Sequence, residues 1–173
     1  NADAIAINKT VQALSTDEVI GLVGLFSEAA WRVMQDGFDA IEIHAAHGYL
    51  LSQFLSPYFN KRNDRFGGNF QNRLRFPLAI VDSIQRKCGK NFPILIRYSV
   101  DEWVPGGRDL TDSVKVAEEF ENAGVAALDL SQSIQERPGA GFYPMYYPEG
   151  WTIYASEEIK KAGQNSSYKQ SFS

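Results

Sequence analysis

The sequence predicts an α/β protein built from parallel βα units, on two observations. Helical and extended patterns alternate three times along the chain. The extended segments are almost wholly apolar, as strands are when they are buried on both faces. A doubly wound sheet and a (β/α)8 barrel both fit this pattern. Because a barrel typically takes about 250 residues, three units indicate only part of one.

The first helix is expected from about Ser15 to Asp36. Ser15 and Glu18 have the spacing of a capping box, in which each side chain bonds the other residue's backbone amide. Apolar residues then recur at helical spacing and give the helix one buried face. Gly37 stands where a left-handed residue commonly ends a helix, and residues 38–44 follow as a short strand.

The second repeat begins with a helix over residues 70–88. Pro77 lies inside it and should either kink the helix or mark its true start. Gly89 ends the helix, and residues 93–98 then form an apolar strand.

The third repeat has the same order. Its helix is expected from Thr111, as the N-cap, to Ala123, with Gly124 as the C-cap. Residues 125–131 are the third strand.

The composition suits one soluble globular domain. Of the 173 residues 44% are apolar, and the net charge is −4. No apolar run approaches the roughly 18–20 residues that span a bilayer, and no secretory signal is visible. We therefore expect a cytoplasmic protein that does not bind a membrane. The acidic balance without a basic cluster argues against nucleic acid as a partner.

Polar side chains gather just after each predicted strand. In a parallel α/β barrel these strand ends form the face that carries the active site, so the group means more than its members would singly. The residues are His44, His47 and Tyr49 after the first strand, Arg97 and Asp101 after the second, and Ser131 after the third.

The two histidines, His44 and His47, also allow readings other than catalysis. They fit a hydrogen-bonded pair at a barrel rim. They have a spacing that suits zinc, but the chain has 2 histidines in all, so a third ligand would have to be a carboxylate. Cys88 falls at the opposite strand end, and we interpret it as a partly buried structural thiol.

Tyr49 and Arg97 have simpler alternatives as well. Tyr49 fits a packed aromatic residue, and Arg97 fits an ion-pair partner for Asp101 or Glu42. The pattern of residues by itself leaves these alternatives open.

One part of the chain is more specific than these patterns. Residues 41–51 (IEIHAAHGYLL) resemble the signature strand of the Old Yellow Enzyme family of flavin-dependent ene-reductases. The likeness continues through residues 53–57 (QFLSP), 60–68 (NKRNDRFGG) and 72–76 (NRLRF).

The resemblance runs from about Leu14 to Ala162. The family usually has Tyr where Phe66 stands and Glu where Gln71 stands, and neither change touches the chemistry that the resemblance implies. The implied fold is a partial (β/α)8 TIM barrel, with about three central units of the eight in residues 1–162.

The resemblance also implies roles for four residues. In the family, FMN takes hydride from NADH or NADPH and passes it from N5 to an activated alkene. The residues matching His44 and His47 donate hydrogen bonds to the substrate's carbonyl oxygen, and Tyr49 matches the proton donor. Arg97 matches the residue beside the flavin's N1, where a positive charge stabilises the reduced ring. The implied substrate is an α,β-unsaturated carbonyl compound or an enoate.

Residues 131–152 look most like the larger bacterial branch that contains enoate and 2,4-dienoyl-CoA reductases. Members of that branch often carry a [4Fe–4S] cluster and an FAD module beyond the barrel, and these residues show neither. The aromatic residues between Phe142 and Trp151 fit a substrate pocket or ordinary packing.

Residues 163–173 break the resemblance. After the helix around Glu157–Ala162 the family has a strand close to Val-Lys-Ile-Pro-Val-Ile, which is absent here. One coding of residues 163–169 is GGT CAA AAT TCC AGT TAT AAA, and dropping its first G yields that strand. We therefore expect an out-of-frame tail after a one-base insertion; the alternative is a divergent polar loop.

Three hypotheses result. In the first, the chain is part of a flavin oxidoreductase; Asn1 in place of Met also suggests a part of a longer protein. In the second, it is part of a metal-dependent barrel hydrolase that uses His44 and His47. In the third, it is an inert truncated product. The isolated chain is expected to expose unpaired strand edges and to bind FMN poorly. The alkene, the choice between NADH and NADPH and the oligomeric state stay open.

Overall fold

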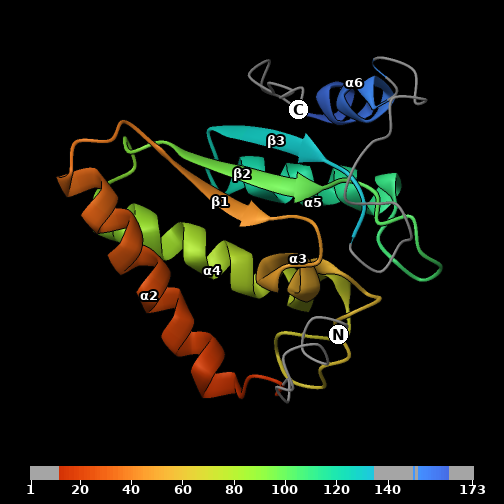
Figure 1. The fold of residues 1–173 in the computed structure, drawn as a ribbon, viewed down its shortest axis with the longest axis horizontal. Coiled ribbons are helices and arrows are strands. Elements are labelled where there is room, and N and C mark those ends of the chain that lie inside the picture. Colours follow the sequence, from red (N-terminus) through yellow and green to blue (C-terminus); the bar gives the residue numbers. More distant parts are fainter. Residues whose placement is uncertain (1–11, 135–149, 151, 164–173) are drawn as a thin grey trace, which may run out of the picture.

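A computed structural model describes residues 12–134, 150 and 152–163. The elements follow in the order α2 (Thr16–Gln35), β1 (Ile41–Ala45), α3 (Leu50–Leu55), α4 (Phe70–Cys88), β2 (Ile94–Ser99), α5 (Leu110–Asn122), β3 (Ala127–Ser131) and α6 (Ile153–Ala162). The strands pair in parallel in the order β1-β2-β3 (Figure 1). Within these ranges, no helix is both long and apolar enough to cross a membrane.

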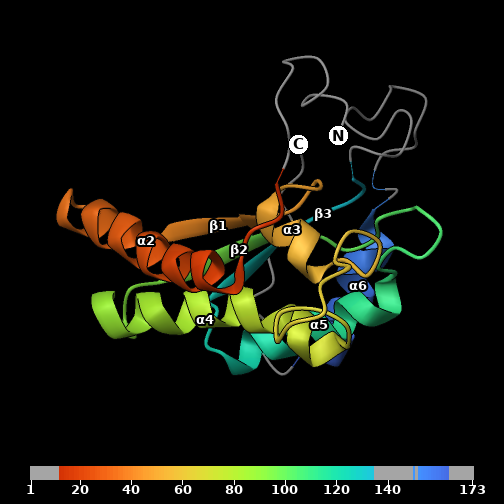
Figure 2. The same cartoon turned by 90° about the horizontal axis from the view of Figure 1, so that it is seen from below.

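The helices α2, α4 and α5 lie along one face of the sheet (Figure 2). Successive side chains of a strand point to opposite faces. In β1, Ile43 and Ala45 are buried toward the helices, whereas Glu42 and His44 are exposed. The expectation of burial on both faces is therefore wrong for the residues that the structure describes. One face is covered, and the other is open.

The core lies between the sheet and these helices. Ile43, Ile96 and Leu128 are register partners across the three strands and are at most 5% exposed. Phe76 of α4 is fully buried, and its ring centroid lies 4.6 Å from that of Phe54. This packing fixes α4 beneath the strands and joins α3 to it.

The start of α2 agrees with the prediction from the sequence. The Ser15 hydroxyl accepts a hydrogen bond from the Glu18 amide (3.2 Å), and the Glu18 carboxylate accepts one from the Ser15 amide (2.7 Å). The capping box is thus confirmed. Gly37 follows the helix with φ +87°, a conformation in which other residues are strained.

The two later helices correct the prediction in detail. α4 begins at Phe70, after Asn69 as N-cap, and continues through Pro77, which therefore does not mark its start. The buried side chains on both sides of the proline hold the helix together. α5 is capped by Asp109, which accepts a hydrogen bond from the Asp112 amide, and not by Thr111.

The loop between α3 and α4 is held by its own polar side chains. Buried Asn60 donates from Nδ2 to two backbone carbonyls, at 2.7 Å each. Arg62 donates to the Asp64 carboxylate (Nη2 to Oδ2, 2.5 Å) and holds the pKa of that group well below its usual range. A Cβ atom on Gly67 would lie 2.4 Å from the Arg62 carbonyl oxygen, so the loop requires glycine there. The residues of this loop, which lie in the stretch 60–68 that resembles the family, therefore support the fold.

Candidate functional site

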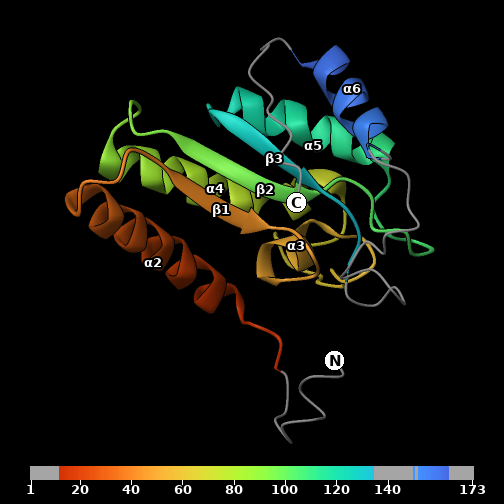
Figure 3. The same cartoon turned by 45° about the horizontal axis from the view of Figure 1, so that its top comes forward.

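The carboxyl end of β1 leads through a tight turn into α3 (Figure 3). His47 and Gly48 adopt left-handed conformations, with φ +59° and +78°. The Gly48 amide donates to Ser52 Oγ (3.2 Å), and its carbonyl accepts from Gln53 Nε2 (2.6 Å). Side chains at the start of α3 therefore hold the turn in place.

This turn gathers three ring side chains that the sequence singles out. The ring centroids of His44 and His47 lie 5.3 Å apart, and those of His44 and Tyr49 also lie 5.3 Å apart. Tyr49 is 53% exposed. The rings stand at the open end of the sheet, where a ligand can reach them.

Arg97 is the register partner of His44 on one side and of Asp129 on the other. Since alternate residues share a face, Arg97 and His44 lie on the same open face of the sheet. Arg97 Nε is 3.4 Å from Asp129 Oδ2. The ion-pair partner of Arg97 is therefore Asp129, and the alternative of Asp101 or Glu42 is wrong.

Asp101 shapes the loop that follows β2. Its carboxylate accepts a hydrogen bond from the Trp103 amide (2.9 Å), and its carbonyl accepts one from the Ser133 amide (2.6 Å). Through these two backbone contacts Asp101 supports the rim of the site.

The electrostatics keep both imidazoles neutral. Partial desolvation by its neighbours, and then the charge of Arg97, lowers the pKa of His44 from its ordinary value. Burial, and then His44, lowers the pKa of His47 to about 4. Partial desolvation, and then the neighbouring Asp129, raises the pKa of Glu42. At neutral pH each histidine thus has one N–H to donate.

Several residues of the site are absent from the sequence-based prediction or left undecided by it. The His47 amide donates to Ser99 Oγ (3.0 Å), and His47 Nε2 lies 2.6 Å from Ser131 Oγ. A charged residue inside an apolar strand is a signal that could have identified Asp129. Nothing in the local sequence marks Ser99.

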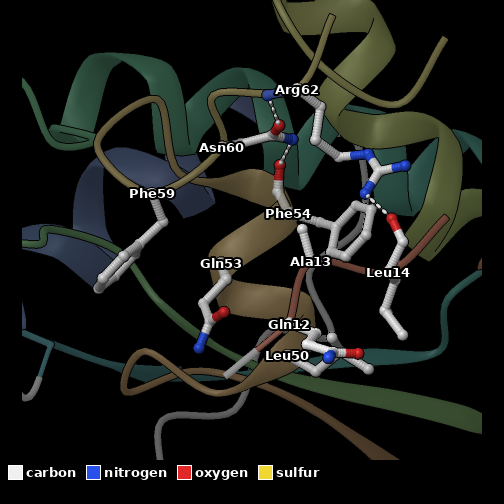
Figure 4. A pocket seen from close by; sticks show the side chains of 9 residues that line it. All are labelled: Gln12, Ala13, Leu14, Leu50, Gln53, Phe54, Phe59, Asn60 and Arg62. Atoms are coloured by element: carbon white, nitrogen blue, oxygen red, sulfur yellow. Dashed lines mark hydrogen bonds between the residues drawn. The ribbon is translucent and has the colours of Figure 1, made fainter. Parts of the chain in front are cut away.

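A cavity of about 280 Å³ lies beside α3 (Figure 4). It is lined by Gln12, Ala13, Leu14, Leu50, Gln53, Phe54, Phe59, Asn60 and Arg62. None of the four predicted site residues is among them. Gln53, which bonds the Gly48 carbonyl, connects the cavity to the turn.

Among the described residues, no group of three histidine, cysteine, aspartate or glutamate side chains could hold a metal ion. Cys88 is a half-buried free thiol whose pKa is raised by burial, as expected for a structural cysteine. The aromatic stretch between Phe142 and Trp151 and residues 164–173 lie outside the described residues.

The fold has close counterparts among solved structures. A complex of 2-naphthoyl-CoA reductase with 2-naphthoyl-CoA superposes with a TM-score of 0.86 and 27% identity, over 92% of this chain and 24% of that chain. The three βα units are therefore part of a (β/α)8 TIM barrel, which confirms the predicted fold class.

Residues 1–139 match the NADH:flavin oxidoreductase / NADH oxidase family, and the chain belongs to that family. NADH oxidase of Thermoanaerobacter brockii is 42% identical over 86% of this chain and 23% of its own length. Cinnamate reductase of Clostridium sporogenes is 36% identical over 88% of this chain and 25% of its own length. The chain thus spans about a quarter of these relatives.

Proposed function

We propose that this chain forms the central part of the FMN-binding barrel of a longer NAD(P)H-dependent oxidoreductase that reduces activated C=C bonds. One observation carries the proposal: the rings of His47 and Tyr49 lie against the ring of His44, which shares the open face of the sheet with Arg97. Family membership supports a flavin and a nicotinamide as reaction partners. When bound, FMN supplies the hydride from its N5.

The residues present fit a flavin. Arg97 Nε is buried 3.4 Å from Asp129 Oδ2, and it donates no hydrogen bond within the described part of the chain. The guanidinium lies on the open face of the sheet, and its side chain is 28% exposed. It therefore has donors and a fixed positive charge for an electron-rich ring.

The rings fit an α,β-unsaturated carbonyl compound or an enoate. His44 and His47 are neutral donors, and donors placed near the substrate oxygen stabilise the negative charge that develops there during hydride transfer. Tyr49 then gives its phenolic proton to the α-carbon as a general acid. The name of the cinnamate reductase relative supports this substrate class.

No step requires the [4Fe–4S] cluster or the FAD that the resemblance suggests. A cluster takes four thiolates, and this chain has 1 cysteine, so a cluster would have to be bound elsewhere in the longer protein. We also propose that residues 163–173 are an out-of-frame tail. The nucleotide sequence decides this point, because its other frame must encode the missing strand.

Replacing Tyr49 with Phe in the longer protein tests the function. We expect alkene reduction to slow by about 10²–10⁴-fold, because the proton donor is lost. Reduction of the flavin by NADH or NADPH should be unchanged. Tyr58→Phe is the matched control, since Tyr58 is also part-exposed but packs against Phe59. Stopped-flow measurement of each half-reaction separates the cases, and equal losses in both would exclude the role of Tyr49.

A further inference from the structure

His47 is held at two points by serines of neighbouring strands. Its amide donates to Ser99 Oγ (3.0 Å) on β2, and its ring Nε2 lies 2.6 Å from Ser131 Oγ on β3. Ser99 and Ser131 are register partners, and both are buried. The two hydroxyls thus reach the same histidine from adjacent strands.

The Ser99 hydroxyl fixes the backbone. His47 and Ser133 both have positive φ, at +59° and +72°, which is uncommon for residues other than glycine. The Ser99 hydroxyl accepts from the His47 amide and donates to the Ser133 carbonyl (2.8 Å). It therefore joins the two left-handed residues and sets the direction in which the His47 ring leaves the chain.

The Ser131 hydroxyl affects which ring nitrogen of His47 carries the proton. Because the pKa of His47 is about 4, the imidazole is neutral near pH 7 and has a single N–H, on either Nδ1 or Nε2. A proton on Nε2 would make Ser131 the acceptor, and its own hydroxyl proton would then need a further acceptor. Ser131 is 8% exposed, and no such acceptor is found in the described ranges. A hydroxyl that donates to Nε2 leaves no buried donor unsatisfied.

We propose that Ser131 is a positioning residue that donates its hydroxyl proton to Nε2 of His47 and thereby fixes the Nδ1–H tautomer. Nδ1 is then the atom through which His47 donates to a ligand oxygen. This donor role rests on the proposed function, whereas the tautomer is a property of the protein alone. The ligand that fits it carries a carbonyl oxygen that gains negative charge, or an oxyanion.

The tautomer is measured by ¹⁵N NMR of the longer flavoprotein labelled with ¹⁵N-histidine, with His47→Gln identifying the signals. We expect a protonated Nδ1 and an unprotonated Nε2. Ser131→Ala should move the proton toward Nε2, and Ser131→Thr, which keeps a hydroxyl, should not. Ser113→Ala is the matched control, because Ser113 is also buried but lies on α5.

The second readout is the affinity for 4-nitrophenol, whose phenolate oxygen is an acceptor. Ser131→Ala should weaken its binding by about 10-fold or more, the effect of losing a hydrogen bond to a charged group. Ser131→Thr should retain most of the affinity.

The outcomes separate the two proposals. A proton on Nε2 in the unchanged protein, or a tautomer unaffected by Ser131→Ala, overturns the role of Ser131. A shifted tautomer with unchanged 4-nitrophenol affinity overturns the donor role of Nδ1. If the proposed function alone fails, Tyr49→Phe leaves alkene reduction intact while the tautomer still depends on Ser131.

Discussion

Two rows of side chains cross the sheet one residue apart and differ in chemistry. The first row is Ile43, Ile96 and Leu128, which is buried on the helix-covered face. The second row is His44, Arg97 and Asp129, which is polar and lies on the open face. Each strand therefore contributes neighbouring residues to the core and to the candidate site.

The difference shows how the site is positioned. Because side chains alternate between faces, a slip of one residue in register would exchange the two rows. Such a slip would bury the polar row against the helices, at a large cost in free energy. The apolar row thus fixes the register, and the polar row acquires its geometry from it.

The largest effect is expected for the apolar row. Ile96→Ala in the longer protein should lower the free energy of unfolding by about 2–5 kcal/mol, because Ile96 is 1% exposed and its removal leaves a cavity. Ile96→Val should cost about 0.5–1.5 kcal/mol. Urea denaturation measures both variants. A loss for Ile96→Ala no larger than that for Ile96→Val would remove this residue from the role of fixing the register.

A substitution at Arg97, one residue along, should affect binding by the longer protein more than its stability. Arg97→Met should weaken FMN binding by about 10-fold or more, since a charged hydrogen-bond donor is lost. Arg97→Met should lower the free energy of unfolding by about 1 kcal/mol or less, because the ion pair with Asp129 is part-exposed.

Fluorescence titration with FMN and urea denaturation measure these two effects of Arg97→Met. Arg97→Lys is the control that keeps the charge but loses the planar fork, and it should give an intermediate affinity. Loss of stability as large as that of Ile96→Ala, with unchanged FMN affinity, would place Arg97 in the scaffold instead.

The repeating units could be predicted from the sequence because their signals are local. Capping residues, helical periodicity and terminal glycines each lie within a few positions of the feature that they specify. The N-cap of α5 shows the limit of this reasoning. Asp109 and Thr111 are both suitable capping residues two positions apart, and only packing decides between them.

The contacts within the site depend on information that is not local. The pairing of Arg97 with Asp129 and the hydrogen bond from the His47 amide to Ser99 Oγ both follow from strand register. The family resemblance brought His44, His47, Tyr49 and Arg97 forward as individual residues. It carried no information on the serines that hold His47 or on the acid beside Arg97.

The smallest effect is expected from pH, and it concerns the polar row and its neighbours. Burial lowers the pKa of His47 from 6.5 to about 4, so between these values the unfolded chain binds more protons than the folded one. Stability should therefore fall as the pH falls through this window and be insensitive to His47 above it. His47→Gln should reduce the difference in melting temperature between about pH 7.5 and about pH 5.

Glu42 acts in the opposite direction. Its pKa is raised by partial desolvation and then by Asp129, so the folded chain binds its proton more readily than the unfolded chain and gains stability as the pH falls. Glu42→Gln should therefore steepen the acid loss that His47→Gln reduces. Equal slopes in the unchanged protein and both variants would show that neither group titrates differently on folding, and these two neighbours of the polar row would then lack the desolvation that separates them from a solvated surface.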